Sequence, residues 1–250
     1  MRDAAPLRLG NGEIIYGRHA VAAALANRDR THKMLWLTDA ALADDLPVSK
    51  SLTVEIVARV ALDRALERMS PNAVHQGIVL STSPLPDLIL DEVLNAHDDM
   101  AGPLVLLDQV TDPHNIGAIL RSAAVFGARA LITTERNTPA DTAVLAKSAS
   151  GALELVPIVR VVNLSRALHA IGEAGYWRLG LAEGGSRTIG EAAAGHGKVA
   201  LVLGAEGPGL RRLTKENCDE LVHLPAHGSF TTLNVSNAAA VALYAISEKA

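Results

Sequence analysis

Side chains that could bind a ligand gather in three short segments in the second half of the chain. They are DQVTDPHN (108–115), GAEGPG (204–209) and LPAHGSFTTLN (224–234). The first two begin at the end of an aliphatic run typical of a strand, and the third leads into an apolar helix. Ligands of α/β proteins bind at the carboxyl ends of strands, so these loops mark the candidate site. His114 has no second ligand at a suitable spacing, so we predict no metal site.

Arg121 is the only charged residue of NIGAILRSAAVFGA (115–128), which reads as a helix. Its helical neighbours three and four positions away are small and apolar: Gly117, Ala118, Ala124 and Val125. We interpret this pattern as an arginine that lies in a cleft beside a closely packed helix. The alternative is an arginine that reaches water from a buried helix.

Polar residues also open the apolar helix predicted from about Asn234 to Ser247. They are Thr231, Thr232, Asn234, Ser236 and Asn237. Helix capping explains one or two of them, and we expect the others to hydrogen-bond a ligand at the helix N-terminus. Asn115 also begins a helix, after Asp112 and Pro113, so a capping role is an open alternative for it.

The turn GAEGPG does not fit a phosphate-binding loop. Gly209 is followed by Leu210 and Arg211, without the Gly-Lys-Ser/Thr of a P-loop, and the glycine order differs from the dinucleotide fingerprint. A tight turn at the end of a strand, with Glu206 in water, is the plainer interpretation.

The order of the elements predicts two α/β units. The first has a helix over 17–27, strands over 33–38 and 52–57, a helix over 58–69 and a strand over 76–82. In the second, strands over 103–109, 129–134, 153–161, 176–182, 198–204 and 220–225 are interleaved with helices over 115–128, 140–149, 164–175 and 234–247. This alternation predicts a mostly parallel sheet covered on both faces. We place a small domain at 1–80, a proline-rich linker at 81–102 and the larger domain at 103–250.

Composition is that of a globular protein and excludes several classes. The chain has 250 residues and 49% hydrophobic residues, without an apolar run near the roughly 18 needed to span a bilayer. The first ten residues lack the apolar core of a signal peptide, so we predict a cytoplasmic protein. A single cysteine, Cys218, excludes an intrachain disulfide framework and a cysteine-rich zinc site.

The net charge of −4 argues against nucleic-acid binding through overall charge, but the first 35 residues form a basic segment. It contains Arg18, His19, Arg28 and Arg30, among others. A solvated surface and a contact with an anionic polymer both fit this pattern.

Together the three loops resemble the signature motifs of the SpoU (TrmH) family of S-adenosylmethionine-dependent RNA ribose 2′-O-methyltransferases. The motifs are DQVTDPHNIGAILRSA, LVLGAEGPGLR and LPAHGSFTTLNVSNAAA, in that order. IYGRHAVAAAL and AVHQGIVL extend the resemblance over nearly the whole chain. It is strongest to members that modify a guanosine of large-subunit ribosomal RNA.

The resemblance implies a SPOUT-type catalytic domain with a C-terminal trefoil knot, preceded by a small α/β RNA-binding domain. The cofactor would be S-adenosyl-L-methionine, bound by backbone around Gly204, Leu224 and Leu233, without a metal. The enzyme would be a homodimer with its site near the subunit interface. The RNA-binding role would fall on the basic segment, namely Arg18, His19, Arg28 and Arg30. Asn237 stands where relatives often have a small apolar residue.

The resemblance also implies a catalytic set, which comprises Asn115, Arg121, Glu206, Asn234 and Ser236. Family accounts make the motif arginine a general base, but a guanidinium is effectively always protonated. We expect Arg121 to hold the target phosphate and stabilise the developing alkoxide, paired with Glu206, while Asn115 orients the ribose. Asn234 and Ser236 would complete the pocket.

Two other functions fit the same motifs. One is a ribose methyltransferase that acts on transfer RNA. The other is a non-catalytic RNA-binding assembly factor on this fold, against which the intact polar set argues.

Overall fold

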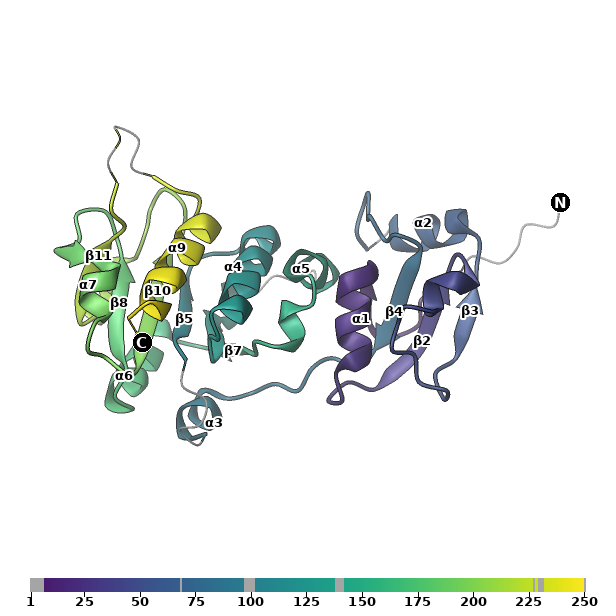
Figure 1. Cartoon of the computed structure of the whole chain (residues 1–250), viewed down its shortest axis with the longest axis horizontal. Helices are drawn as coiled ribbons and strands as arrows, with labels where there is room; N and C mark the ends of the chain where they lie inside the picture. Colours follow the sequence, from purple (N-terminus) through teal and green to yellow (C-terminus); the bar gives the residue numbers. More distant parts are fainter. Residues whose placement is uncertain are drawn as a thin grey trace. The chain divides into compact units, whose positions relative to one another are not determined.

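The computed structural model describes residues 7–67, 69–96, 102–137, 142–226, 228 and 232–249. Its contacts divide the chain into two compact units (Figure 1). The described residues of the first unit lie within 7–86 and 142–154, and those of the second within 87–137 and 155–249. In the part of the chain that the structure describes, no helix is long and apolar enough to cross a membrane.

The first unit contains a four-stranded sheet with the order β1-β4-β2-β3. The strands are β1 (Glu13–Tyr16), β2 (His32–Leu37), β3 (Val54–Ile56) and β4 (Ile78–Thr82). β4 pairs antiparallel with β1 and β2, whereas β2 and β3 are parallel. β4 lies in the interior of the sheet and all of its residues are buried, which explains why it opens with the aliphatic run Ile-Val-Leu. Our sequence analysis did not predict β1.

Helices α1 (Arg18–Ala26), α2 (Arg59–Glu67) and α5 (Thr142–Ala149) belong to this unit, with the short 3-10 helices η1 (Ala40–Ala43) and η3 (Ala152–Glu154). Ile14, Trp36, Leu62 and Ala143 share one buried cluster, which joins β1, β2, α2 and α5. The unit therefore takes part of its core from a segment far along the sequence. The predicted ranges 1–80 and 103–250 stay a prediction, and the structure adds the segment 142–154 to the first unit.

The second unit contains a seven-stranded sheet with the order β7-β6-β5-β10-β8-β11-β9, in which every pairing is parallel. Its strands are β5 (Leu104–Asp108), β6 (Ala130–Thr134), β7 (Ile158–Val161), β8 (Trp177–Leu181), β9 (Arg187–Thr188), β10 (Val199–Gly204) and β11 (Glu220–His223). All residues of β5 and β6 are buried. This confirms the predicted parallel sheet.

Helices cover both faces of this sheet (Figure 1). α3 (Leu90–Asn95) and α6 (Leu164–Glu173) pack on one face, where Val93 and Leu168 join the cluster that contains Leu104 and Leu106. α4 (Pro113–Val125), α7 (Ile189–Ala193) and α9 (Val235–Ser247) pack together on the opposite face. α8 (Arg212–Glu216) follows the turn after β10. Successive residues of a strand point to opposite faces, so both layers use the same apolar runs.

The structure corrects the predicted strand over 153–161, because η3 occupies its start and only Ile158–Val161 is extended. Pro157 precedes this strand and limits its length. Our sequence analysis also missed β9, α7 and α8. Each is only two to five residues long, too short to produce a periodic pattern.

Candidate functional site

Asn115 lies in the first turn of α4 without capping it. The cap is Asp112, whose Oδ1 accepts a hydrogen bond from the backbone N–H of His114 at 2.9 Å, and Pro113 is the first helical residue. The Asn115 side chain is therefore available for other contacts.

Glu206, in the turn after β10, is the centre of a hydrogen-bonded group. Its Oε1 accepts from Asn115 Nδ2 and from the backbone N–H of Val235, each at 3.4 Å, and from Asn234 Nδ2. Asn234 Nδ2 also donates to Asn115 Oδ1 at 3.1 Å. The group joins residues from all three loops, and its polar atoms lie at the surface of the unit.

Asn234 also caps α9. Its Oδ1 accepts from the backbone N–H of Ser236 at 2.9 Å and from Ser236 Oγ at 2.5 Å. One asparagine thus fixes both the helix start and the position of Ser236. Thr231 lies outside the described residues, while Thr232 and Asn237 are exposed.

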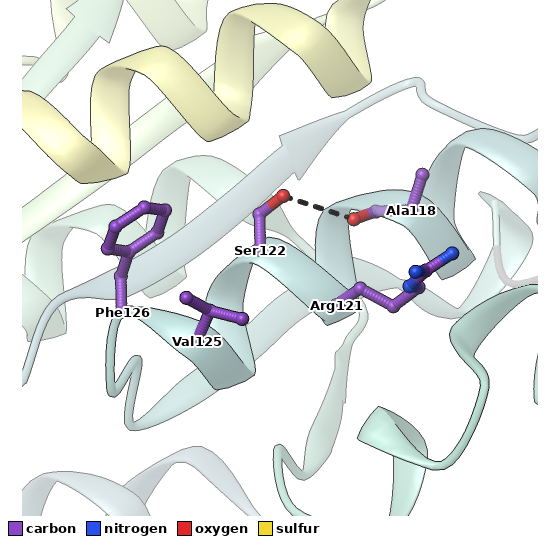
Figure 2. A pocket seen from close by; sticks show the side chains of 5 residues that line it. All are labelled: Ala118, Arg121, Ser122, Val125 and Phe126. Carbon is purple, nitrogen blue, oxygen red and sulfur yellow. Dashed lines mark hydrogen bonds between the residues drawn. The ribbon is translucent and has the colours of Figure 1, made fainter. Parts of the chain in front are cut away.

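Arg121 is exposed and lies apart from this group. It lines a pocket of about 290 Å³ with Ala118, Ser122, Val125 and Phe126, in which Ser122 Oγ donates to the carbonyl of Ala118 at 3.3 Å (Figure 2). The expected pairing of Glu206 with Arg121 does not occur among the described residues. Arg121 follows Asn115 by six residues, which places it on another side of α4 and roughly 9 Å further along the axis.

Gly204 is required by the turn itself. A Cβ there would lie 2.2 Å from the carbonyl carbon of Gly209 and 2.4 Å from the nitrogen of Leu210. The N–H of Gly209 donates to the carbonyl of Ala205 at 2.9 Å, so the turn closes on its own backbone. The close approach of Gly209 and Leu210 therefore requires a glycine at position 204 whether or not a ligand is bound. Cofactor binding by its backbone, and by that of Leu224 and Leu233, stays a prediction.

Asp108 and Arg211 were missed by our sequence analysis. Asp108 ends β5, is fully buried, and lies beside Gly204 in the strand register. Its Oδ2 accepts from the backbone N–H of Arg211 at 2.9 Å and its Oδ1 from Arg211 Nε at 2.6 Å. The ion pair holds the far end of the GAEGPG turn. The available signal was a carboxylate at the end of an apolar strand.

Three of the predicted RNA-binding residues are exposed in the first unit: Arg18, His19 and Arg28. Arg18 forms an ion pair with Asp45, and both side chains are exposed. The pair is therefore worth little to stability, and Arg18 can exchange its partner.

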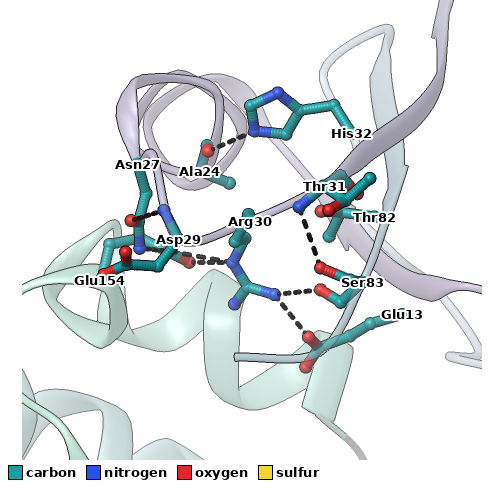
Figure 3. A network of polar contacts seen from close by, with 10 residues as sticks. All are labelled: Glu13, Ala24, Asn27, Asp29, Arg30, Thr31, His32, Thr82, Ser83 and Glu154. Carbon is teal, nitrogen blue, oxygen red and sulfur yellow. Dashed lines mark hydrogen bonds and ion pairs between the residues drawn. The ribbon is translucent and has the colours of Figure 1, made fainter. Parts of the chain in front are cut away.

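Arg30, in contrast, is a structural residue, which corrects its predicted RNA-binding role (Figure 3). Its side chain is 0% exposed. Nη1 donates to Glu13 Oε2 at 2.6 Å and to the carbonyl of Ser83 at 2.8 Å, and Nε donates to Glu154 Oε2 at 2.8 Å. Burial disfavours the charged guanidinium, but the hydrogen bonds to Glu154 and Glu13 outweigh it and raise the pKa of Arg30. No phosphate could reach this group.

Within the described ranges, no group of three or more His, Cys, Asp or Glu side chains could hold a metal ion. The polar set of Asn115, Glu206, Asn234 and Ser236 consists of amide, carboxylate and hydroxyl groups. It is suited to hydrogen-bonded recognition of hydroxyl groups rather than to metal chemistry.

A parallel sheet with these three loops at its carboxyl edge defines an α/β fold with a ligand site at that edge, and comparison with known families identifies the class. Residues 102–244 match the SpoU rRNA Methylase family, and residues 14–88 match the family of RNA 2′-O ribose methyltransferase substrate-binding domains. The chain belongs to the SpoU rRNA methylase family. The resemblance found in the sequence is confirmed.

Among curated relatives, the chain is 40% identical over 245 residues to the 23S rRNA (guanosine-2′-O-)-methyltransferase RlmB of Vibrio cholerae, with 94% of this chain and 96% of the relative covered. It is 39% identical to RlmB of Escherichia coli, with 93% and 96% covered. It is also 37% identical to an uncharacterized tRNA/rRNA methyltransferase of Synechocystis, covering 94% of this chain but only 62% of that longer protein.

Solved structures agree on the fold. The SpoU methyltransferase AviRb from Streptomyces viridochromogenes, in complex with AdoMet, is 25% identical with a TM-score of 0.78, covering 96% of this chain and 94% of that chain. An AdoMet-bound rRNA methyltransferase from Sinorhizobium meliloti is 21% identical with a TM-score of 0.75, covering 95% and 87%. Both comparisons span the small and the large unit, so the predicted SpoU-type α/β domain preceded by a small domain is confirmed, while the trefoil knot stays a prediction.

Proposed function

We propose that the protein transfers the methyl group of S-adenosyl-L-methionine to the ribose 2′-hydroxyl of a guanosine in 23S ribosomal RNA. The observation that carries this proposal is the hydrogen-bonded group of Asn115, Glu206, Asn234 and Ser236, which joins the three family motifs at one point. The chain matches the RlmB relatives over nearly their whole length, which supports 23S rRNA as the substrate and guanosine as the target nucleotide.

The loops fit the proposed cofactor. Gly204 is the last residue of β10, and Leu224 directly follows β11. Leu233 lies just before α9, and 52% of its surface is exposed. An exposed leucine beside backbone segments offers apolar contact and amide hydrogen bonds to an adenosine. S-adenosylmethionine, when bound, supplies an electrophilic methyl group on a sulfonium.

The chain's own residues must then position the ribose hydroxyl. All three hydrogen bonds that Glu206 accepts go to Oε1, and among the described residues Oε2 accepts none. Oε2 is therefore available to accept a hydrogen bond from a ribose hydroxyl. Asn115 and Ser236 orient the sugar, since Asn234 holds both in place.

Arg121 is assigned to the phosphate beside the target ribose. Its guanidinium is exposed and makes no ion pair within the described residues, so it can form a bidentate contact with a phosphate. Glu206 organises the amides of Asn115 and Asn234, and it no longer has the predicted role of holding Arg121.

We also propose that the protein acts as a homodimer through the face formed by α4 and α9. Val125 is 76% exposed, Tyr244 54% and Val241 44%, and Phe126 packs edge-on against Tyr244 with ring centroids 6.2 Å apart. Apolar and aromatic side chains on two adjacent helices are typical of a subunit interface. This face adjoins the Arg121 pocket. The proposal also includes a cytoplasmic location and a trefoil knot in the C-terminal part of the large unit.

The test is methyl transfer to protein-free, unmethylated 23S rRNA with purified protein and S-adenosylmethionine, followed by mapping of ribose methylation. We expect one modified guanosine. Arg121→Ala should lose activity but retain cofactor affinity, while Arg166→Ala, an exposed arginine on α6, should remain active. Methylation of bulk tRNA without methylation of 23S rRNA would overturn the proposed substrate.

A further inference from the structure

Three segments of the first unit meet at the beginning of α1. Lys147 of α5 donates from Nζ to Gln76 Oε1 at 3.0 Å, and the same oxygen accepts the backbone N–H of Arg18 at 3.0 Å. A Cβ on Gly17 would lie 2.3 Å from Lys147 Nζ, so only a glycine lets the ammonium lie this close to the backbone. Gln76 therefore positions Lys147 against the helix start.

The charge of Lys147 is not neutralised. Its partner is an uncharged amide, and within the described ranges it forms no ion pair with a carboxylate. The Lys147 side chain is partly buried, and this burial disfavours the charged ammonium and lowers the pKa of Lys147. A half-buried cation without a counter-charge is unfavourable unless an anion completes it.

Gln76 is held in a conformation that non-glycine residues rarely adopt. Its φ is +56° and that of the following Gly77 is +79°. The loop is fixed by His75, which is 1% exposed. Nδ1 of His75 accepts the N–H of Gly77 at 3.1 Å, and Nε2 lies 2.8 Å from Asp63 Oδ1. The fold thus maintains backbone strain in order to place one exposed side chain.

We propose that Lys147, positioned by Gln76, binds a backbone phosphate of the RNA substrate. The inference rests on the proposed function and adds to it a residue from the segment 142–154, which lies outside the range matched to the substrate-binding family. Arg18 is exposed in the adjoining first turn of α1, and it can add a second cation if it exchanges Asp45 for a phosphate.

A phosphodiester fits this site better than a base or a small metabolite. A lysine ammonium is a compact point charge, suited to a phosphate oxygen rather than to the edge of a base. The cluster lies at the surface, where a polymer backbone can pass.

The first test compares Lys147→Met with Lys50→Met, an exposed lysine of the same unit that serves as a matched control. The affinity for unmethylated 23S rRNA and for bulk tRNA is measured from about 50 to about 300 mM salt, a range over which the logarithm of the affinity falls linearly with the logarithm of the salt concentration. Loss of one phosphate contact should reduce the salt slope by about 0.7–0.9, which is about five- to eightfold weaker binding at 0.1 M salt. Lys50→Met should change neither quantity. An unaltered slope in Lys147→Met would overturn the proposal.

The second test is Gln76→Glu, which places a carboxylate beside Lys147 without removing a contact. If Lys147 binds phosphate, RNA affinity falls at least as far as in Lys147→Met, while the melting temperature is unchanged or higher because a new ion pair forms. If Lys147 has only a structural role, the variant is stabilised and binds RNA normally. The second result would refute the inference.

Cofactor binding separates this inference from the proposed function. S-adenosylmethionine affinity, measured by calorimetry, should be the same in wild type, Lys147→Met and Gln76→Glu. If wild type fails to methylate 23S rRNA yet the RNA-binding differences appear, the proposed substrate is wrong and the phosphate contact stands. If methylation occurs but Lys147→Met binds RNA normally, the phosphate contact is wrong.

Discussion

Replacement of Arg30 by methionine tests the buried ion pairs of the first unit. The change keeps an unbranched apolar side chain but removes every hydrogen bond of the guanidinium. It leaves the carboxylates of Glu154 and Glu13, whose side chains are only 5% and 13% exposed, without their cation. Asn27 Nδ2, which donates to Glu154 Oε2 at 2.7 Å, remains as a neutral partner.

The expected loss follows from this burial. Removing one partner of a buried ion pair typically destabilises a protein by about 3–5 kcal/mol, because the remaining charge is desolvated and unpaired. Glu154 should account for most of the loss, since Glu13 can reach water more easily. A domain of this kind has only about 5–15 kcal/mol of stability in total, so the first unit should unfold far more readily.

Each unit contains one of the two tryptophans, which makes the assay specific. Trp36 lies in β2 at 3% exposure, and Trp177 lies in β8. In a Trp177→Phe background, fluorescence during urea unfolding reports the first unit alone. The midpoint and slope for Arg30→Met then give the loss of free energy of unfolding directly.

Arg28→Met is the matched control, because Arg28 is exposed and two residues away. It should leave the unfolding midpoint within about 0.5 kcal/mol of wild type. Glu154→Gln should cost less than Arg30→Met, and the double variant should cost less than the sum of the two. A loss below about 1 kcal/mol for Arg30→Met, or strict additivity, would refute the buried ion pair.

Three more predictions concern the second unit. Gly204→Ala should lower the free energy of unfolding by about 2 kcal/mol or more, because the new methyl group overlaps the backbone of Gly209 and Leu210, and it should abolish cofactor binding. Gly207→Ala, with φ +82° and open space around it, should cost only about 1 kcal/mol. Thermal melts compare the stability of the two variants, and calorimetry compares their cofactor binding. Burial raises the pKa of Cys218 to about 12, so the native thiol should resist Ellman's reagent at pH 8, and stability should fall as the pH rises above about 9 because only the unfolded chain then loses the proton. Cys218→Ala should lack that decline. Val125→Asp should convert a dimer into a monomer in analytical ultracentrifugation, and an unchanged sedimentation coefficient would argue against the α4/α9 interface.

Local pattern was sufficient for the parallel sheet of the large unit, apart from the short elements β9, α7 and α8. Strands such as 104–107 and 199–203 are continuous apolar runs because helices cover both of their faces. The alternation of such runs with helices led to the parallel sheet. Its carboxyl edge then followed as the place of the site, since all the strands point the same way.

The motifs contain Asn115, Glu206, Asn234 and Ser236, which the fold brings together, but they did not predict which of these residues touch, and the catalytic role of the set stays a prediction. Glu206 and Asn115 are 91 positions apart, and Asn234 and Asn115 are 119 apart. The pairing of Glu206 with amides rather than with Arg121 depends on where α4 turns relative to β10. That geometry is absent from the residue types alone.

Arg30 shows the same limit in the first unit. An arginine in a basic segment is normally solvated, so the sequence favoured an exposed, RNA-binding residue. Its partner Glu154 lies 124 positions away, on a distant segment of the sequence that belongs to the first unit in the folded structure. Burial of a charge depends on a counter-charge brought from elsewhere in the chain, and only the tertiary structure determines that pairing.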